Sequence, residues 1–404
     1  MIIMTKATSQ ITTSSTLNVL TSSSSNSNIK NLCVNLSFAA SSGIITLISS
    51  ITGIMQISNY QVLGKYQSTQ AIAMIGITVN SISMDINKIQ FKPSLYYVGN
   101  CSSYLFSNVV SNLFTFFQNN IAIILGNCDS YQTFGSTSSS SSNIYQFGGI
   151  ISNLGINSKI TIINYLADCY KTFSTKYVSK SGIIIGQIES NTSNIMISNL
   201  CIQLQISSTT IYNMFGLLGS CYGNSSLQQV SIIISVKGSQ FQSFGLIGQQ
   251  SNSNYSEIVN LYASVTVQQD IISSLVSVIF GLMQSSYCSI QNVSVVNSNL
   301  IAQYFVGGYI GVCASYTTIY NSFISQTSLS GENNIGGYFG YFPSSAFTVK
   351  IHYSKLDQIR ISGSHDIDIV FGGIAGVPIF VGSYSSQIYV NDVLQSDCPN
   401  LTSC

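Results

Sequence analysis

Side chains that could act as acid and base catalysts cluster at one place in the sequence, near its carboxyl end. Arg360, His365, Asp366 and Asp368 lie within nine residues of one another. Enzymes that cleave polysaccharides need two carboxyl groups to act as acid and base. Strand alternation would place Asp366 and Asp368 on one face and His365 on the other. The cluster allows a polysaccharide-acting hydrolase or lyase as an alternative, and the competing interpretation is a solvated edge where a terminal coil carries its charges.

No other motif in the sequence indicates catalysis, a cofactor or a metal. The ten cysteines include no Cys-x-x-Cys pair and no zinc-finger spacing with histidine. The sequence also has no P-loop, no Gly-x-Ser-x-Gly elbow and no dinucleotide-binding fingerprint. We therefore expect a protein that is not an enzyme and that has no cofactor and no metal.

The cysteines are interpreted mainly as small packing residues. Cys33 and Cys201 follow the motif asparagines described below at the same spacing, which places both on strands. Cys398 and Cys404 close the chain in the sequence DCPNLTSC, outside the last coil, and are the candidate disulfide pair.

These residues must be positioned by a repeat, because one motif recurs along most of the chain. It reads Ile, any residue, Asn, apolar, any residue, apolar. Gln229 takes the asparagine position in a weaker copy, and from Asn164 onward the steps are 35, 30, 31, 32 and 29 residues. A period in this range is typical of proteins whose units bury their apolar faces by stacking on one another. The motif asparagines are Asn31, Asn164, Asn199, Asn260, Asn292 and Asn321.

A second motif, an apolar run framed by glycines, falls between the asparagines. Its copies include FGGIIS from Phe147, FGLLG from Phe215 and VGGYIG from Val306. The copy at 280–284 reads FGLMQ and would replace the closing glycine by Gln284. Glycine suits tight corners and lets neighbouring backbones approach closely. The structural glycines are Gly148, Gly186, Gly219, Gly248, Gly311, Gly340 and Gly376.

Both motifs predict an all-β protein, a right-handed parallel β-helix (β-solenoid) of about 10–12 coils with roughly 30 residues per coil. Each repeat holds short stretches of Ile, Val, Phe and Tyr separated by Gly, Ser and Asn, and charged residues make up only 6% of the chain. In stacked coils, asparagines in register are expected to pass a hydrogen bond from turn to turn. The predicted regions are a loose Ser-rich leader at 1–28, degenerate coils at 29–144, regular coils at 145–392 and a Cys-containing tail at 393–404.

The stretch from Val306 to Gly331 reads VGGYIGVCASYTTIYNSFISQTSLSG, and the next unit begins IGGYFG at Ile335. This pattern resembles GLUG-motif repeats, in which a Gly-Gly-apolar-apolar-Gly box precedes an Ile-x-Asn-Ser strand. The likeness covers about residues 145–390 well and 30–144 poorly, and several boxes lack the second glycine. The resemblance implies a β-solenoid stalk or adhesive region of a surface or secreted protein of bacteria or protists. It supplies no catalytic residues.

We therefore expect a non-enzymatic scaffold, secreted or on the cell surface, that presents a face rich in Ser, Asn and Tyr to glycans or surface proteins. Tyr309, Tyr316, Tyr338 and Tyr341 would provide contacts if they face outward, although tyrosines in a repeat are commonly core or corner residues. The net charge of +1 leaves no electrostatic footprint for nucleic acid. Self-association through exposed end coils is a further option.

No secretory signal is visible in the first residues, because a continuous apolar core is missing there. The fairly apolar stretch at 38–57 contains several Ser and Thr residues, so we interpret it as a coil of the repeat and expect no membrane association.

Overall fold

The computed structural model describes most of the chain as strands, in two compact units, residues 1–213 and 214–404. The described residues are 4–13, 17–21, 24–40, 44–48, 51–68, 71–77, 82–97, 110–116, 121–136, 143–148, 151–154, 159–172, 177–188, 193–207, 211–237, 240–268, 274–343, 349–368, 371–374, 388–390 and 393–395. Their side chains are described at 162, 180–188, 193–206, 212–237, 241–267, 274–343 and 349–366.

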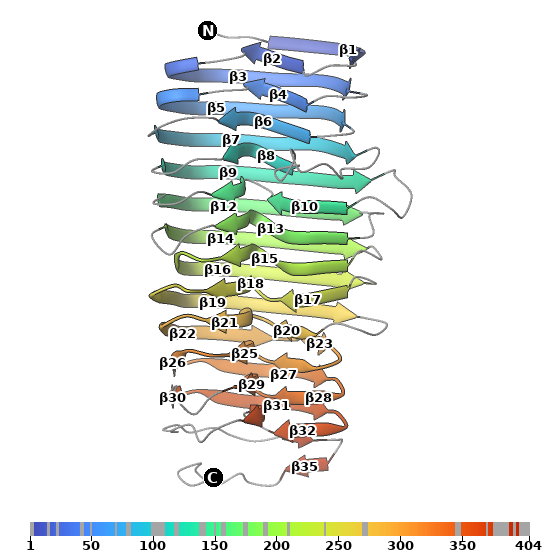
Figure 1. The fold of residues 1–404 in the computed structure, drawn as a ribbon, viewed down its shortest axis with the longest axis vertical. Helices are drawn as coiled ribbons and strands as arrows, with labels where there is room; N and C mark the ends of the chain where they lie inside the picture. Colours follow the sequence, from blue (N-terminus) through green and yellow to red (C-terminus); the bar gives the residue numbers. More distant parts are fainter. Residues whose placement is uncertain are drawn as a thin grey trace. The chain divides into compact units, whose positions relative to one another are not determined.

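Unit 1 is built from two sheets of parallel strands (Figure 1). The strands of its first sheet, in pairing order, are β1 (Met4–Thr13), β3 (Ser24–Ala40), β5 (Ile51–Ser68), β7 (Ile82–Tyr97), β9 (Ile121–Ser136), β12 (Lys159–Thr172) and β14 (Asn194–Ser207). Those of its second sheet are β2 (Leu17–Thr21), β4 (Ile44–Ile48), β6 (Ala71–Ile77), β8 (Val110–Phe116), β10 (Asn143–Gly148), β11 (Ile151–Leu154) and β13 (Tyr177–Ile188). The stretch expected to be a loose leader, 1–28, contains β1, β2 and the start of β3.

Unit 2 repeats the two-sheet arrangement in shorter strands. The strands of its first sheet are β16 (Asn224–Lys237), β19 (Tyr255–Gln268), β22 (Tyr287–Val296), β23 (Asn299–Ile301), β26 (Tyr316–Tyr320), β27 (Phe323–Ser330), β30 (Val349–His352), β31 (Lys355–Ser362), β34 (Ile388–Val390) and β35 (Val393–Gln395). Those of its second sheet are β15 (Ile211–Cys221), which begins in unit 1, β17 (Gln240–Phe244), β18 (Ile247–Ser251), β20 (Leu275–Ser277), β21 (Phe280–Gln284), β24 (Phe305–Gly307), β25 (Ile310–Cys313), β28 (Asn333–Gly336), β29 (Phe339–Phe342), β32 (His365–Asp368) and β33 (Phe371–Ile374).

Successive turns lie on one another in register, as a parallel β-solenoid requires. Tyr255 of β19 pairs with Tyr287 of β22, which pairs with Tyr316 of β26. The well-defined part of the chain makes about five turns of about 31 residues and contains no helix, so the fold class predicted from the repeat is confirmed. The predicted total of 10–12 coils includes residues outside the described ranges. Within those ranges the sole antiparallel pair is β34 with β35.

The core consists of columns of aliphatic side chains, one from each turn. The residue at the opening position of the Ile-x-Asn motif is buried in five successive turns of unit 2, and burial of such a side chain contributes about 1.5–3 kcal/mol. Because the turns are in register, these side chains stack directly on one another. The column comprises Leu227, Ile258, Ile290, Ile319 and Ile351.

The motif asparagines form the corner of each turn, two residues after this column. Asn260, Asn292 and Asn321 all adopt a left-handed backbone, with φ between 46° and 55°. Asn292 Nδ2 donates to Asn260 Oδ1 at 3.0 Å, and Asn321 Nδ2 donates to Asn292 Oδ1 at 2.8 Å. Asparagine tolerates the left-handed region better than most residues, so this residue type satisfies both the bend and the stacking. Asn199 has the same backbone, and so does Gln229.

The other two motif asparagines are Asn31 in β3 and Asn164 in β12, and their side chains lie outside the described residues. In the turn after Asn321 the corner position is held by Tyr353, which is exposed and has a φ of 51°.

A column of glycines lines the second sheet of unit 2. A Cβ atom added to Gly311 would lie 2.6 Å from the carbonyl oxygen of Gly281, and one added to Gly248 would lie 2.6 Å from that of Gly219. Only glycine fits this approach of one backbone to the next. The column comprises Gly219, Gly248, Gly281, Gly311 and Gly340. Among the other glycines named from the sequence, Gly148 and Gly186 lie in β10 and β13, and Gly376 lies outside the described residues.

Gly281 corrects the motif boundaries read from the sequence. Phe280 pairs with Ile247 and with Ile310, so Gly281 is the closing glycine of its turn and Gln284 lies beyond it. The first glycine position is taken by Ser277, which pairs with Gly307. The box in this turn is therefore 276–281. The dipeptide Phe280-Gly281 closes this box, whereas the sequence motif takes a Phe-Gly dipeptide as the opening of a box.

Gly311→Ala should destabilise unit 2 by about 2 kcal/mol, because the new methyl group meets a backbone carbonyl that can move only with its whole turn. Denaturant unfolding of the purified chain measures the change, with Ser325→Ala on the outer face of β27 as the control. Equal stabilities of the two variants would contradict the tight approach.

Tyr353→Asn should be more stable than Tyr353→Ala by about 1 kcal/mol. The ring centroids of Tyr353 and Tyr320 lie 5.4 Å apart, and both variants lose this contact. The difference in stability between the two variants therefore reports what the asparagine side chain contributes. Asparagine accommodates the left-handed backbone and can continue the column from Asn321. The comparison uses thermal and denaturant unfolding, and an alanine variant as stable as the asparagine variant would refute the explanation.

Candidate functional site

An exposed row of tyrosines marks the outer face of the first sheet of unit 2. Tyr255, Tyr287 and Tyr316 begin three adjacent strands in register and are 42%, 59% and 42% exposed. The rings of Tyr287 and Tyr316 lie 5.7 Å apart at an interplanar angle of 27°. Each tyrosine stands five residues before a motif asparagine, so the corner fixes the face to which it points.

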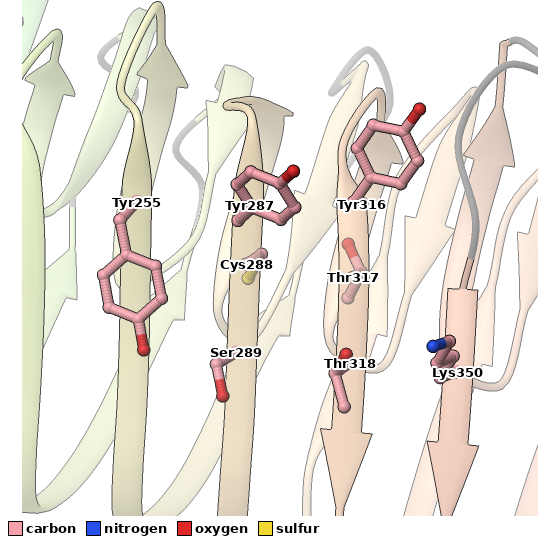
Figure 2. Close-up of a pocket in the computed structure, with 8 residues that line it drawn as sticks. All are labelled: Tyr255, Tyr287, Cys288, Ser289, Tyr316, Thr317, Thr318 and Lys350. Carbon is pink, nitrogen blue, oxygen red and sulfur yellow. The ribbon is translucent and has the colours of Figure 1, made fainter.

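The tyrosines border a shallow groove of about 570 Å³ that crosses four strands (Figure 2). Ser289, Thr318 and Lys350 point outward from β22, β26 and β30 and extend the groove beside the rings. Cys288 and Thr317 also line it, but their side chains are buried beneath the sheet. The accessible surface therefore offers phenol rings, two aliphatic hydroxyls and one ammonium group.

The two ends of the groove differ in their charged neighbours. Next to Tyr255, which lines one end, Glu257 accepts hydrogen bonds from the hydroxyls of Tyr255 and Ser226, each at 3.1 Å. Partial burial and this bond to Glu257 raise the pKa of Tyr255, which keeps its phenol protonated. At the other end, Lys350 is exposed, and the described residues include no carboxylate paired with it.

The tyrosines named from the sequence divide between surface and core. Tyr316 is exposed and Tyr341 is half-buried, with its ring 5.4 Å from that of Phe305. Tyr309 and Tyr338 are buried, so they take the core position common for tyrosines in a repeat and provide no surface contacts. Both rings lie in the core, with their centroids 5.4 Å apart. Tyr309 donates to the carbonyl oxygen of Val293 at 3.3 Å, whereas Tyr338 has no hydrogen-bond partner among the described atoms.

The acid–base cluster is distributed over two strands. Arg360 lies in β31 of the first sheet, and His365 and Asp366 lie in β32 of the second. His365 and Asp366 are both exposed, since Asp366 has a φ of 49° and interrupts the strand alternation. The side chain of Asp368 lies outside the described residues. Where side chains are described, no group of three potential metal ligands is present.

The cysteines whose side chains are described are free thiols. Cys201 is exposed, and Cys221, Cys288 and Cys313 are buried. Burial raises the pKa of Cys221 and of Cys313 to about 12, so these thiols stay protonated and unreactive. Cys33 lies in β3 with an undescribed side chain, and Cys398 and Cys404 lie outside the described residues.

Comparison with protein-family models, with curated proteins and with solved structures finds no match. In the described part of the chain no helix has the length and apolar character to cross a membrane.

Replacing Tyr338 by Phe should leave the stability unchanged or raise it by up to about 1 kcal/mol, because a buried hydroxyl without a partner is removed. Tyr309→Phe is the matched control and should lower the stability by about 1 kcal/mol, since it removes a bonded hydroxyl. Unfolding in denaturant distinguishes the two, and an equal loss in both would mean that Tyr338 has a partner.

Proposed function

We propose that this chain is a non-enzymatic solenoid scaffold that binds glycans along the outer groove of unit 2. The observation that supports the proposal is the row of Tyr255, Tyr287 and Tyr316, exposed in register on adjacent strands. A phenol ring can lie against the apolar C–H face of a sugar, and its hydroxyl can hydrogen-bond the sugar hydroxyls.

The repeat makes such a surface suitable for a polymer. Adjacent strands of a sheet are about 4.8 Å apart, so equivalent groups recur at that interval across the groove. A linear glycan lying across the strands would meet, on each successive turn, a ring with a polar side chain beside it. Each contact is weak, and their sum on a rigid scaffold gives affinity without reorganisation of the protein.

The location proposed for the scaffold is the cell surface or the extracellular medium. Support comes from the resemblance to GLUG-motif repeats and from the surface composition, in which Ser, Thr, Asn and Tyr replace charged residues. A protein with a net charge of +1 has little electrostatic attraction for nucleic acid. Adhesion to a glycan-coated surface is the role that we assign to it.

The test is a glycan array with the full chain, followed by titration with the oligosaccharide that binds best. Tyr287→Ala should weaken binding by about tenfold, because an aromatic contact is lost at the middle of the groove. Tyr262→Ala is the control, since Tyr262 is 45% exposed on β19 but lies beyond the asparagine corner.

Binding that is absent for all glycans, or that falls equally in both variants, would refute the proposal. The bound oligosaccharide should be recovered at its original length. Shortened products would instead support a polysaccharide-acting enzyme, and loss of cleavage in Asp366→Asn would then assign the chemistry to the cluster at 360–368.

A further inference from the structure

A polar row runs beside the tyrosines; three of its members, Ser289, Thr318 and Lys350, line the groove, and the fourth, Glu257, bonds to Tyr255 at its edge. Glu257, Ser289, Thr318 and Lys350 occupy equivalent positions on β19, β22, β26 and β30, each paired in register with the next. Figure 2 shows Ser289, Thr318 and Lys350 level with one another on neighbouring strands. Three interstrand steps separate the ends of the row, a distance of about 14 Å. A ligand that crosses the strands would therefore meet a carboxylate, two hydroxyls and an ammonium group in order.

The carboxylate of Glu257, at one end of this row, already accepts hydrogen bonds from the protein. Glu257 accepts from the hydroxyls of Tyr255 and Ser226 and from Nε2 of Gln228, the last at 3.5 Å. Three donors on one carboxylate stabilise its charge, so a ligand is not needed to neutralise it. A cationic group on a ligand would have to compete with these donors.

At the other end of the row, the ammonium group of Lys350 forms no ion pair with a described residue. Lys350 is exposed beside Thr318 and pairs with no described carboxylate, whereas Lys355 on the next strand of the chain pairs with Asp357 at 3.4 Å. The chain holds only 13 Lys and Arg residues among 404, so a cation on this surface is uncommon. An anionic group on the ligand would pair with it.

We infer that the glycan bound by this groove is anionic, with a carboxylate or sulfate group at Lys350 and its sugar rings over Tyr316 and Tyr287. This inference rests on the proposed glycan binding. The hydroxyls of Ser289 and Thr318 hydrogen-bond the sugar between the two ends of the groove. The neutral sugar rings of the glycan contact the tyrosine rings, and its acidic group sets the direction in which the glycan lies in the groove.

The experiment titrates the full chain with three probes of similar length: a neutral β-glucan oligosaccharide, a polygalacturonate oligosaccharide and a sulfated glycosaminoglycan oligosaccharide. The anionic probes should bind more tightly than the neutral one, and their affinity should fall as salt is added. Lys350→Gln should weaken binding of the anionic probes by about fivefold and leave the neutral probe unchanged. Lys355→Gln is the matched control and should change none of the three.

The outcomes separate this inference from the proposed function. Equal binding of neutral and anionic probes, unaffected by Lys350→Gln, would overturn the anion site while glycan binding stands. An equal loss in Lys350→Gln and Lys355→Gln would also overturn it, since the effect would then come from overall charge. If no probe binds, the proposed function fails together with the inference. A preference for polygalacturonate over the sulfated probe would identify the carboxylate as the group at Lys350, and the reverse preference the sulfate.

Discussion

Backbone hydrogen bonding between parallel turns in register is the constraint on which the other features depend. Because each turn lies directly on the one before it, every residue type that recurs at the same position becomes a column. Aliphatic columns fill the core, and amide columns hold the corners. Charged columns would repel themselves, which explains why a chain with 6% charged residues can adopt this fold and why its surface is made of hydroxyls, amides and phenols.

The sequence predicts the fold and the asparagine corners because each depends on a residue type with few substitutes. Asn260, Asn292 and Asn321 combine a left-handed backbone with an amide that bonds to its neighbour in the column, and Asn292 uses both ends of its amide. The glycine column could be predicted less completely. At 276–281 the box reads Val-Ser where its neighbours have Phe-Gly or Val-Gly, and a Phe-Gly pair stands at its far end, so the letters alone favour the wrong alignment.

The groove was not predicted from the sequence, because tyrosine is amphipathic and its residue type does not fix whether it is buried or exposed. Tyr309 and Tyr316 stand seven residues apart, yet the first is buried and the second exposed. The face that each takes depends on its position relative to the corner and the box, and on which strands become neighbours. A usable signal did exist, since Tyr255, Tyr287 and Tyr316 each stand at one fixed distance before a motif asparagine.

The amides at the corners also have a consequence for how such a molecule could change in length. Both observed amide bonds run the same way, from each turn to the one before it, and each turn contacts chiefly its two neighbours. If one complete repeat were removed or duplicated, the corner amide of one turn would still meet an equivalent amide on the turn before it. The aliphatic and glycine columns would also stay aligned. Deleting part of a repeat would break all the columns at once. A protein of this architecture is therefore expected to lengthen or shorten in evolution by whole turns.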